Sequence, residues 1–189
     1  MGGGTRAAVF LDRDGVLNKA FVTEAGTPSP PRSIDELEIL PGVIESCDRL
    51  RELGYLLVVV TNQPDIARGT LDASVVDEIN LRLQAELTLD SVWTCPHDDS
   101  DGCACRKPRP GLLLEAAQHH GIDLERSFMV GDRWRDVEAG RGAGCKTLWV
   151  VDPTYKDPPA VGADVRVRDL RDATHWIESR FSSVGGSGK

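Results

Sequence analysis

Short apolar runs alternate with amphipathic segments along most of the chain. Six apolar runs predict β-strands over residues 7–11, 56–60, 91–94, 127–130, 146–151 and 164–167. Amphipathic spacing predicts helices over residues 43–53, 72–87, 110–120 and 170–181, with Asp72 and Pro110 as typical first residues of two of them. Strands that alternate with helices favour a parallel sheet. The pattern therefore predicts an α/β fold with a parallel central sheet.

The segment from residue 21 to residue 38 fits neither the strand nor the helix period. It contains Pro28, Pro30 and Pro31, which interrupt both kinds of element. We expect a loop over the sheet here rather than a domain boundary. The chain is thus expected to form a single domain over residues 1–189, with frayed ends at 1–5 and 182–189, which are rich in glycine and serine.

The composition is that of a soluble, acidic protein. Thirty acidic residues against 22 basic ones give a net charge of −8 over 189 residues, which disfavours binding to a nucleic-acid backbone. The longest apolar run, at 56–60, is far shorter than the ~20 residues of a membrane helix, and no signal peptide is recognisable. We expect a cytoplasmic monomer that binds neither nucleic acid nor membranes.

Polar residues follow three of the predicted strands. Asp12-Arg13-Asp14-Gly15 follows the first, Thr61-Asn62 the second, and Gly131-Asp132 the fourth, with Asp136 four residues further on; Lys107 comes from a loop. Taken singly, each of these is as easily a turn or a surface charge. The carboxyl ends of parallel strands share one edge, where ligands collect. The four signals together therefore predict one site.

The residue types in this predicted site suit phosphoryl transfer. Clustered carboxylates repel one another unless a hard cation lies among them, and Mg²⁺ prefers such oxygen ligands together with a substrate phosphate. One aspartate can attack phosphorus, and a carboxyl group two residues away can donate and accept the proton. A hydroxyl and an ammonium group, from Thr61 and Lys107, can stabilise the transferring group.

A second cluster has the composition of a zinc site. Cys95, His97, Cys103 and Cys105 offer three thiolates and an imidazole within eleven residues, the set that binds Zn²⁺ tetrahedrally. Four protein ligands leave no open position, so the predicted role is structural; the alternative is a reduced, metal-free loop. Because Arg106 and Lys107 follow Cys105 directly, fixing Cys105 also fixes where the lysine points.

The ordered motifs D-x-D-G, a strand ending in Thr, Lys, and G-D-x-x-x-D resemble the haloacid dehalogenase superfamily over residues 12–136. Within it, Phe-Leu-Asp-Arg-Asp-Gly-Val-Leu-Asn, Val-Thr-Asn-Gln and Cys-Arg-Lys-Pro are most similar to the bacterial D,D-heptose 1,7-bisphosphate phosphatase and histidinol-phosphate phosphatase group. The resemblance implies a Rossmann-like three-layer sandwich with a parallel central sheet, a minimal cap and a zinc-binding loop.

The resemblance also implies roles for individual residues. Asp12 would be the nucleophile and Asp14 the general acid and base, with Thr61 and Lys107 stabilising the phosphoryl group. Mg²⁺ would be held by the Asp12 carboxylate, the Asp14 backbone carbonyl and Asp132, and Asp136 would support them from behind. Substrate binding is expected from Asn62, Arg106 and Arg133, since arginine suits bidentate recognition of phosphate.

The expected function is a Mg²⁺-dependent phosphatase that works through an aspartyl-phosphate, with a heptose 1,7-bisphosphate, losing its 7-phosphate, as the leading substrate. Histidinol phosphate is the alternative substrate. A non-catalytic zinc-loop binding module and a nucleic-acid end phosphatase are alternatives of other kinds. Two departures from the group bear on the substrate: Pro64-Asp65 replaces the usual Ser-Gly, and the segment 21–38 is longer and richer in proline. Both are expected to border the pocket.

Overall fold

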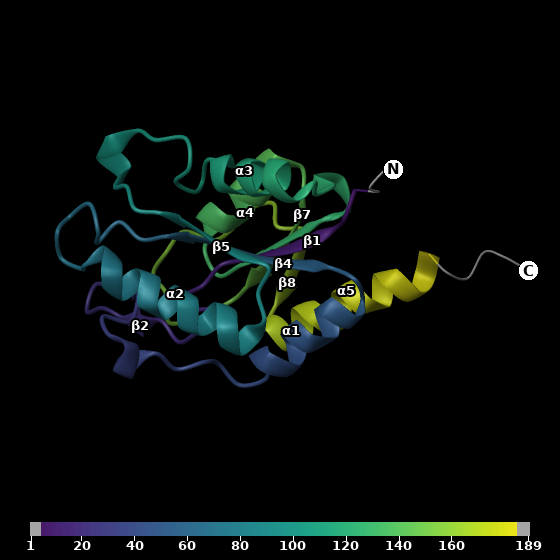
Figure 1. The fold of residues 1–189 in the computed structure, drawn as a ribbon, viewed down its shortest axis with the longest axis horizontal. Helices are drawn as coiled ribbons and strands as arrows, with labels where there is room; N and C mark the ends of the chain where they lie inside the picture. Colours follow the sequence, from purple (N-terminus) through teal and green to yellow (C-terminus); the bar gives the residue numbers. More distant parts are fainter. Residues whose placement is uncertain (1–4, 185–189) are drawn as a thin grey trace, which may run out of the picture.

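A six-stranded parallel sheet forms the centre of the molecule in the computed structural model, which describes residues 5–184 (Figure 1). The strands are β1 (Ala8–Leu11), β4 (Leu56–Asn62), β5 (Ser91–Cys95), β6 (Phe128–Gly131), β7 (Lys146–Val150) and β8 (Val165–Val167). Their spatial order is β5-β4-β1-β6-β7-β8. All six predicted strands are confirmed, and so is the parallel arrangement.

Helices cover both faces of the sheet (Figure 1). One face carries α1 (Val43–Glu52), α2 (Ala73–Leu87) and α5 (Leu170–Val184), and the other carries α3 (Gly111–His120) and α4 (Trp134–Ala143). Successive residues of β1 point to opposite faces, so Val9 and Leu11 pack in the first core and Ala8 and Phe10 in the second. The expected three-layer sandwich is confirmed.

Helix α4 was not predicted from the sequence. Its two glycines, Gly140 and Gly142, weaken the helical signal. A Cβ atom at Gly140 would lie 2.6 Å from the Met129 Cβ and 2.8 Å from the Thr147 Cγ2, so glycine allows the helix to pack closely on β6 and β7. Tertiary packing, not propensity, maintains this helix.

The segment 21–38 contains more structure than the expected loop. Strands β2 (Phe21–Val22) and β3 (Pro28–Ser29) form a short antiparallel hairpin, followed by the 3₁₀ turn η1 (Ile34–Glu36). Gly26, at φ +79°, allows the hairpin to turn, and its carbonyl accepts a hydrogen bond from the Lys156 backbone at 3.0 Å. This hairpin is small, which agrees with the minimal cap that was expected. Two other 3₁₀ turns are η2 (Asp99–Asp101) and η3 (Leu124–Arg126).

The last helix extends further than expected, since α5 continues to Val184 although the frayed tail was predicted from residue 182. Residues 1–4 and 185–189 lie outside the described part of the chain, and so do the corresponding predictions. Of the helices within residues 5–184, none combines the length and hydropathy that a membrane crossing requires.

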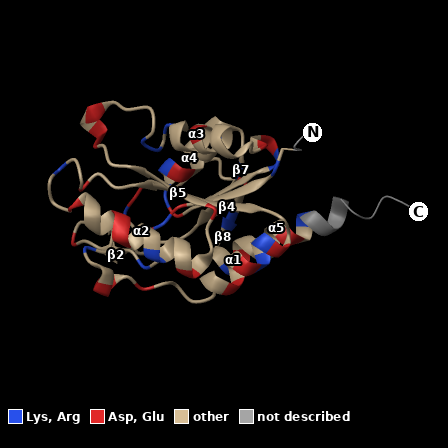
Figure 2. Cartoon of the chain, viewed as in Figure 1, with Lys and Arg blue, Asp and Glu red and all other residues tan. Residues whose placement is uncertain are grey.

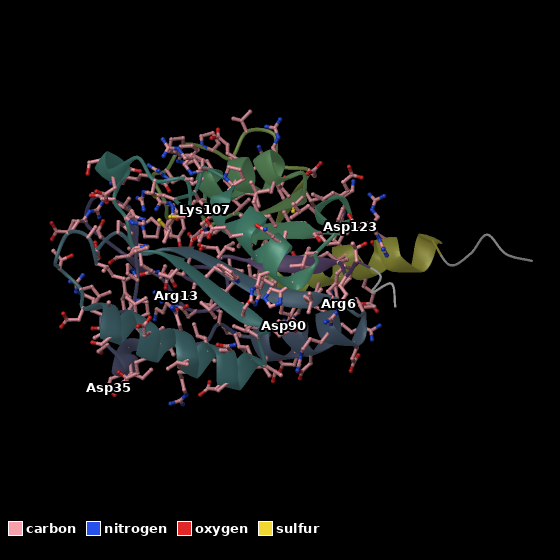
Figure 3. The ribbon with its side chains drawn as sticks, turned by 45° about the horizontal axis from the view of Figure 1, so that its top comes forward. Arg6, Arg13, Asp35, Asp90, Lys107 and Asp123 are labelled. Carbon is pink, nitrogen blue, oxygen red and sulfur yellow. The ribbon has the colours of Figure 1, made fainter. Side chains whose placement is uncertain are left out.

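The topology brings the predicted site together. From β1 the chain builds β4 and β5 on one side, then returns to place β6, β7 and β8 on the other, so β1 lies at the switch point of the sheet. Figure 3 shows Lys107 and Arg13 at one end of the molecule and Arg6, Asp90 and Asp123, which precede strands, at the opposite end. The carboxyl ends of β4, β1 and β6 are neighbours at the first of these ends.

Candidate active site

Asp12 and Lys107 form the floor of the site. Asp12 directly follows β1, and its backbone N–H donates to the Val130 carbonyl of β6 at 2.9 Å. The Lys107 ammonium donates to Asp12 Oδ1 at 2.7 Å and to the Val60 carbonyl of β4 at 2.7 Å, and it pairs with Asp136 Oδ1 at 2.5 Å. Only 2% of the Lys107 side chain is exposed. The lysine therefore joins the end of β1, strand β4 and the first turn of α4 from inside the protein.

Three buried carboxylates gather around this ammonium. Asp12, Asp132 and Asp136 each offer an oxygen, and these atoms lie within 4.8 Å of one another. Among the described residues, neither buried carboxylate oxygen of Asp132 has a hydrogen bond of normal geometry, although the Tyr155 hydroxyl lies beside it. An unpaired buried carboxylate is costly. A cluster of hard oxygen ligands, two of them without a hydrogen bond of normal geometry, fits a divalent cation such as Mg²⁺.

The electrostatics of the cluster support the same fit. Burial raises the pKa of Asp12 to about 6, although the Lys107 ammonium opposes the shift. Burial, with the charges of Asp12 and Asp136, also raises the pKa of Asp132 well above its ordinary range. Burial alone would lower the pKa of Lys107, but Asp12 and Asp136 outweigh it and raise that pKa. A divalent cation would favour the ionised forms of these carboxyl groups.

Asp14 lies in a ring of hydrogen-bond donors. Its carboxylate accepts from Arg13 Nη2 at 3.0 Å, from Asn18 Nδ2 at 2.9 Å and from Gln63 Nε2 at 2.8 Å. Arg13 is fully buried, and Gln63 also donates to Thr61 Oγ1 at 2.8 Å. Gln63 thus joins Thr61 to Asp14. Sequence reasoning gave no role to Arg13 or Gln63, although both stand inside the motifs that it quoted.

Asn62 contacts the loop that carries the lysine. Its side-chain Nδ2 donates to the Lys107 carbonyl at 3.0 Å, and its Oδ1 accepts from the Lys107 backbone N–H at 3.1 Å. This reciprocal pair holds the backbone of Lys107 against the end of β4. Asn62, predicted to bind substrate, also lines the cavity.

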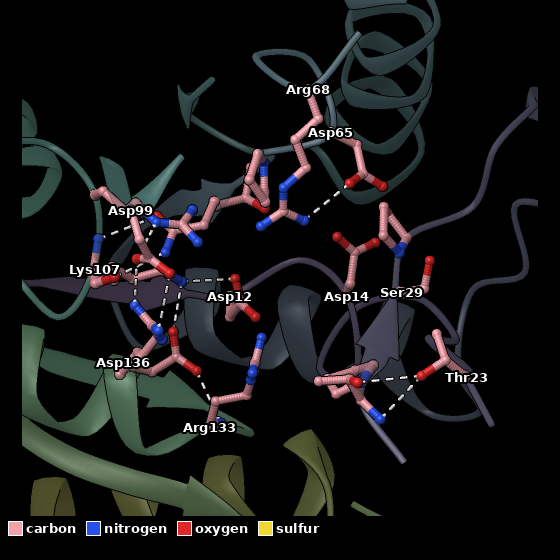
Figure 4. Close-up of a pocket in the computed structure, with 18 of the residues that line it drawn as sticks. Asp12, Asp14, Thr23, Ser29, Asp65, Arg68, Asp99, Lys107, Arg133 and Asp136 are labelled. Atoms are coloured by element: carbon pink, nitrogen blue, oxygen red, sulfur yellow. Dashed lines mark hydrogen bonds and ion pairs between the residues drawn. The ribbon is translucent and has the colours of Figure 1, made fainter. Parts of the chain in front are cut away.

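A cavity of about 630 Å³ opens above this floor (Figure 4). Figure 4 shows Lys107 and Asp99 on one side of Asp12, and Asp14, Ser29 and Thr23 on the other. The floor is acidic, whereas five arginines reach the lining: Arg32, Arg68, Arg106, Arg133 and Arg135. Figure 2 shows acidic residues spread over the helices and the tip of the η2 loop, so a group of arginines in one cavity is notable in this acidic chain.

Both arginines predicted to bind substrate lie in this lining with their guanidinium groups already paired. Arg106 Nε donates to Asp99 Oδ1 at 2.8 Å and its Nη1 to the His97 carbonyl at 3.1 Å. Arg133 donates to both oxygens of Asp157, one of them at 3.0 Å. An incoming phosphate has to compete with these carboxylates.

The cysteines and the histidine of the second cluster converge as a tetrahedral site requires. Sulfur atoms of Cys95, Cys103 and Cys105 are 3.2, 3.4 and 3.7 Å apart, and His97 Nδ1 lies 3.3 Å from Cys105 Sγ and 3.6 Å from Cys95 Sγ. Zinc–sulfur bonds of about 2.3 Å place tetrahedral sulfur ligands about 3.8 Å apart. All three cysteines are free thiols. The donor set and its spacing fit Zn²⁺.

The site combines an aspartate after the first strand of a parallel sheet, a lysine that pairs with it, and further carboxylates after the neighbouring strand. These features define a hydrolase of the haloacid dehalogenase (HAD) class, which has an α/β fold. The HAD-hydrolase-like family model matches residues 104–173. The D-glycero-β-D-manno-heptose-1,7-bisphosphate 7-phosphatase of Helicobacter pylori is 34% identical over 92% of this chain and 98% of its own length. The enzyme of the same name from Photorhabdus laumondii is 38% identical over 90% of this chain and 95% of its own length.

A solved structure agrees with these relatives. The D,D-heptose 1,7-bisphosphate phosphatase from B. bronchiseptica, crystallised with magnesium and phosphate, superposes with a TM-score of 0.74 at 32% identity, over 92% of this chain and 99% of that one. The chain belongs to the family of heptose-1,7-bisphosphate 7-phosphatases, within the HAD phosphatases. It is a phosphoric monoester hydrolase, and a non-catalytic binding module is therefore set aside.

Proposed function

We propose that this phosphatase removes the 7-phosphate of D-glycero-D-manno-heptose 1,7-bisphosphate, the substrate that names its relatives. One observation carries the proposal: the Asp12 carboxylate lies at the floor of the cavity, 2.7 Å from the Lys107 ammonium and within 4.8 Å of Asp132 and Asp136. This arrangement supports the proposed roles, because one phosphate group could contact the carboxylate, the ammonium and the potential metal ligands together.

Asp12 attacks phosphorus in line in the proposed reaction. The bond from phosphorus to the sugar oxygen breaks as the bond to the Asp12 carboxylate forms, and Asp14 gives its proton to the leaving oxygen. Asp14 then takes a proton from water, which attacks the aspartyl-phosphate and releases inorganic phosphate. Throughout, the Thr61 hydroxyl and the Lys107 ammonium stabilise the charge on the equatorial oxygens.

Mg²⁺ would be held by the Asp12 carboxylate, the Asp14 backbone carbonyl and Asp132; the lack of a normal hydrogen bond at the buried Asp132 oxygens supports this assignment. When bound, the ion neutralises charge on the phosphoryl group and orients it. Asp136 lies behind this set, because its oxygens already engage Lys107 and the Arg133 backbone N–H.

Zn²⁺ is proposed at Cys95, His97, Cys103 and Cys105, with a structural role. The loop that they anchor leads directly into Arg106 and Lys107. Four protein ligands leave the ion no open position for water, so its contribution is to fix the backbone that carries the lysine.

The test is phosphate release from the 1,7-bisphosphate and from histidinol phosphate with Mg²⁺ present. We expect release from the heptose compound, and none once Asp12 is changed to Asn, while the zinc content of the variant stays at the wild-type level. Preferential turnover of histidinol phosphate would replace the proposed substrate. Activity that persists in Asp12→Asn would remove Asp12 as the nucleophile.

A further inference from the structure

Two segments that lie far apart in the sequence meet at the cavity. Arg32 comes from the proline-rich segment 21–38, and Asp65 from the Pro64-Asp65 pair. Arg32 Nη1 lies 3.6 Å from Asp65 Oδ2, and Arg32 Nη2 donates to the Thr70 carbonyl. Both residues line the cavity. Two residues 33 positions apart in the sequence (65 − 32 = 33) thus form one contact in space.

Arg32 differs from the other four arginines of the lining in how its donors are used. Within residues 5–184, its guanidinium group makes one hydrogen bond, to the Thr70 carbonyl, and its only nearby carboxylate is beyond hydrogen-bond distance. The other four each donate to a carboxylate: Arg68 to Asp98, Arg106 and Arg135 to Asp99, and Arg133 to Asp157.

This difference decides which arginine can accept a new anion most readily. A guanidinium group has five N–H donors, and a phosphate binds best to two that are parallel and free. At the four paired arginines an incoming anion must first displace a carboxylate. Arg32, with 48% of its side chain exposed, has only the longer ion pair to Asp65, at 3.6 Å, and an anion can bind its remaining donors without displacing a hydrogen-bonded carboxylate.

The wall around Arg32 suits a phosphorylated polyol. Thr23, Thr27 and Ser29 of the hairpin and Thr70 bring four hydroxyl groups to the same lining. Figure 4 shows Thr23 and Ser29 beyond Asp14, on the opposite side from Lys107. Asp65, 16% exposed, also pairs with Arg68 Nη1 at 3.3 Å, so it is held in place from the other side. The hairpin side of the cavity thus offers hydroxyls and one cation with free donors.

We propose that Arg32, positioned by Asp65, binds the phosphate group of the substrate that is not cleaved. This assignment rests on the proposed function and deepens it. Arg32 is then a specificity-determining residue: it selects a bisphosphate over a sugar that carries only the phosphate to be removed. The proline-rich segment then carries the arginine, and Asp65 orients its guanidinium group at the cavity.

The test compares kcat/KM for heptose 1,7-bisphosphate with kcat/KM for heptose 7-phosphate, which lacks the distal phosphate. In the Arg32→Gln variant the ratio of the two should fall about tenfold to a hundredfold, the effect of one charge-assisted, bidentate contact. Arg32→Lys should recover part of this ratio. Arg82→Gln is the matched control, because Arg82 pairs with Glu86 on the exposed side of α2, away from the cavity.

A second variant tests the coupling between the segments. The double change Pro64→Ser and Asp65→Gly should lower the ratio when Arg32 is present and have no further effect in the Arg32→Gln background. An unchanged ratio in Arg32→Gln, or equal losses with both substrates, would overturn the assignment while leaving the proposed function intact. Failure of the wild type to release phosphate from the bisphosphate would instead overturn the proposed function, and this assignment with it.

Discussion

Replacing Lys107 by Met tests whether its ammonium holds the carboxylate cluster together. The substitution keeps an apolar stem of similar length and removes a charge that contacts Asp12, Asp136 and the Val60 carbonyl, at 2.7, 2.5 and 2.7 Å. Because the side chain is 2% exposed, water cannot replace the lost contacts without entering the core. Three buried carboxyl groups then remain without the ammonium that pairs with two of them, Asp12 and Asp136.

The size of the effect follows from this burial. Removing one partner of a buried ion pair costs about 3–5 kcal/mol. Protonation limits the loss: with the lysine gone, the pKa of Asp12, already raised to about 6 by burial, rises further. The folded variant then holds more protons than the unfolded chain, so its stability falls as pH rises. The deficit relative to the wild type should grow between about pH 6 and about pH 8, by up to about 1.4 kcal/mol per pH unit for each extra proton retained.

Urea unfolding of the zinc-loaded protein without added Mg²⁺ measures this deficit at each pH, and adding Mg²⁺ should reduce it. Phosphate release should fall about 10²–10³-fold, as when one charge-stabilising group is removed from an active site. Lys146→Met is the control, because Lys146 is an exposed lysine at the start of β7, and the site lies at the carboxyl ends of the strands. If Lys107→Met matched the wild type in unfolding free energy at every pH, the ammonium would not be what holds the cluster together.

Three further predictions follow from contacts around this cluster. Asn62→Ala should lose about 1–3 kcal/mol of stability, because it removes both hydrogen bonds that hold the Lys107 backbone. In kinetic assays the variant should lower kcat more than it raises KM. A rise in KM alone would instead indicate that Asn62 binds the substrate directly. Cys105→Ser should lower the zinc content, measured by elemental analysis, and kcat, measured by phosphate release. A normal kcat in a variant without zinc would contradict the proposed structural role of the ion. Mg²⁺ affinity should rise with pH from about 5 to about 7, because Asp12 loses its proton over this range. The fluorescence of Trp149, which donates to the Asp132 carbonyl, can report Mg²⁺ binding. An affinity that does not change with pH would contradict the raised pKa of Asp12.

The floor of the site could be predicted because its signals are local in sequence. Asp12, Thr61 and Asp132 each follow an apolar run, and the sheet topology that joins those runs follows from simple alternation. Helix α4 was missed for the opposite reason. Gly140 allows the helix to pack closely against Met129. This contact joins parts of the chain that are distant in sequence, so a local sequence pattern does not predict it.

The rim of the cavity depends on pairings that a single sequence does not show. Arg106 and Arg133 were chosen for their place beside motifs, yet both guanidinium groups are paired with carboxylates, and the Asp157 partner of Arg133 lies 24 residues away. Arg32 attracted no attention because it lies in a segment without a period. Its distinction, free donors at the cavity, appears only when the partners of all five arginines are known.

Substrate choice in this chain is therefore a question of which rim arginine is free, not of how many there are. Each carboxylate that pairs with a rim arginine raises the concentration of anion needed to displace it, and so discriminates against weakly charged substrates. In the proposed reaction, Asp12, Thr61 and Lys107 contact only the phosphate that leaves, so these three residues would not distinguish one phosphomonoester from another. Selection must then arise at the other end of the substrate, where Arg32 carries the one guanidinium group in the described lining that donates no hydrogen bond to a carboxylate.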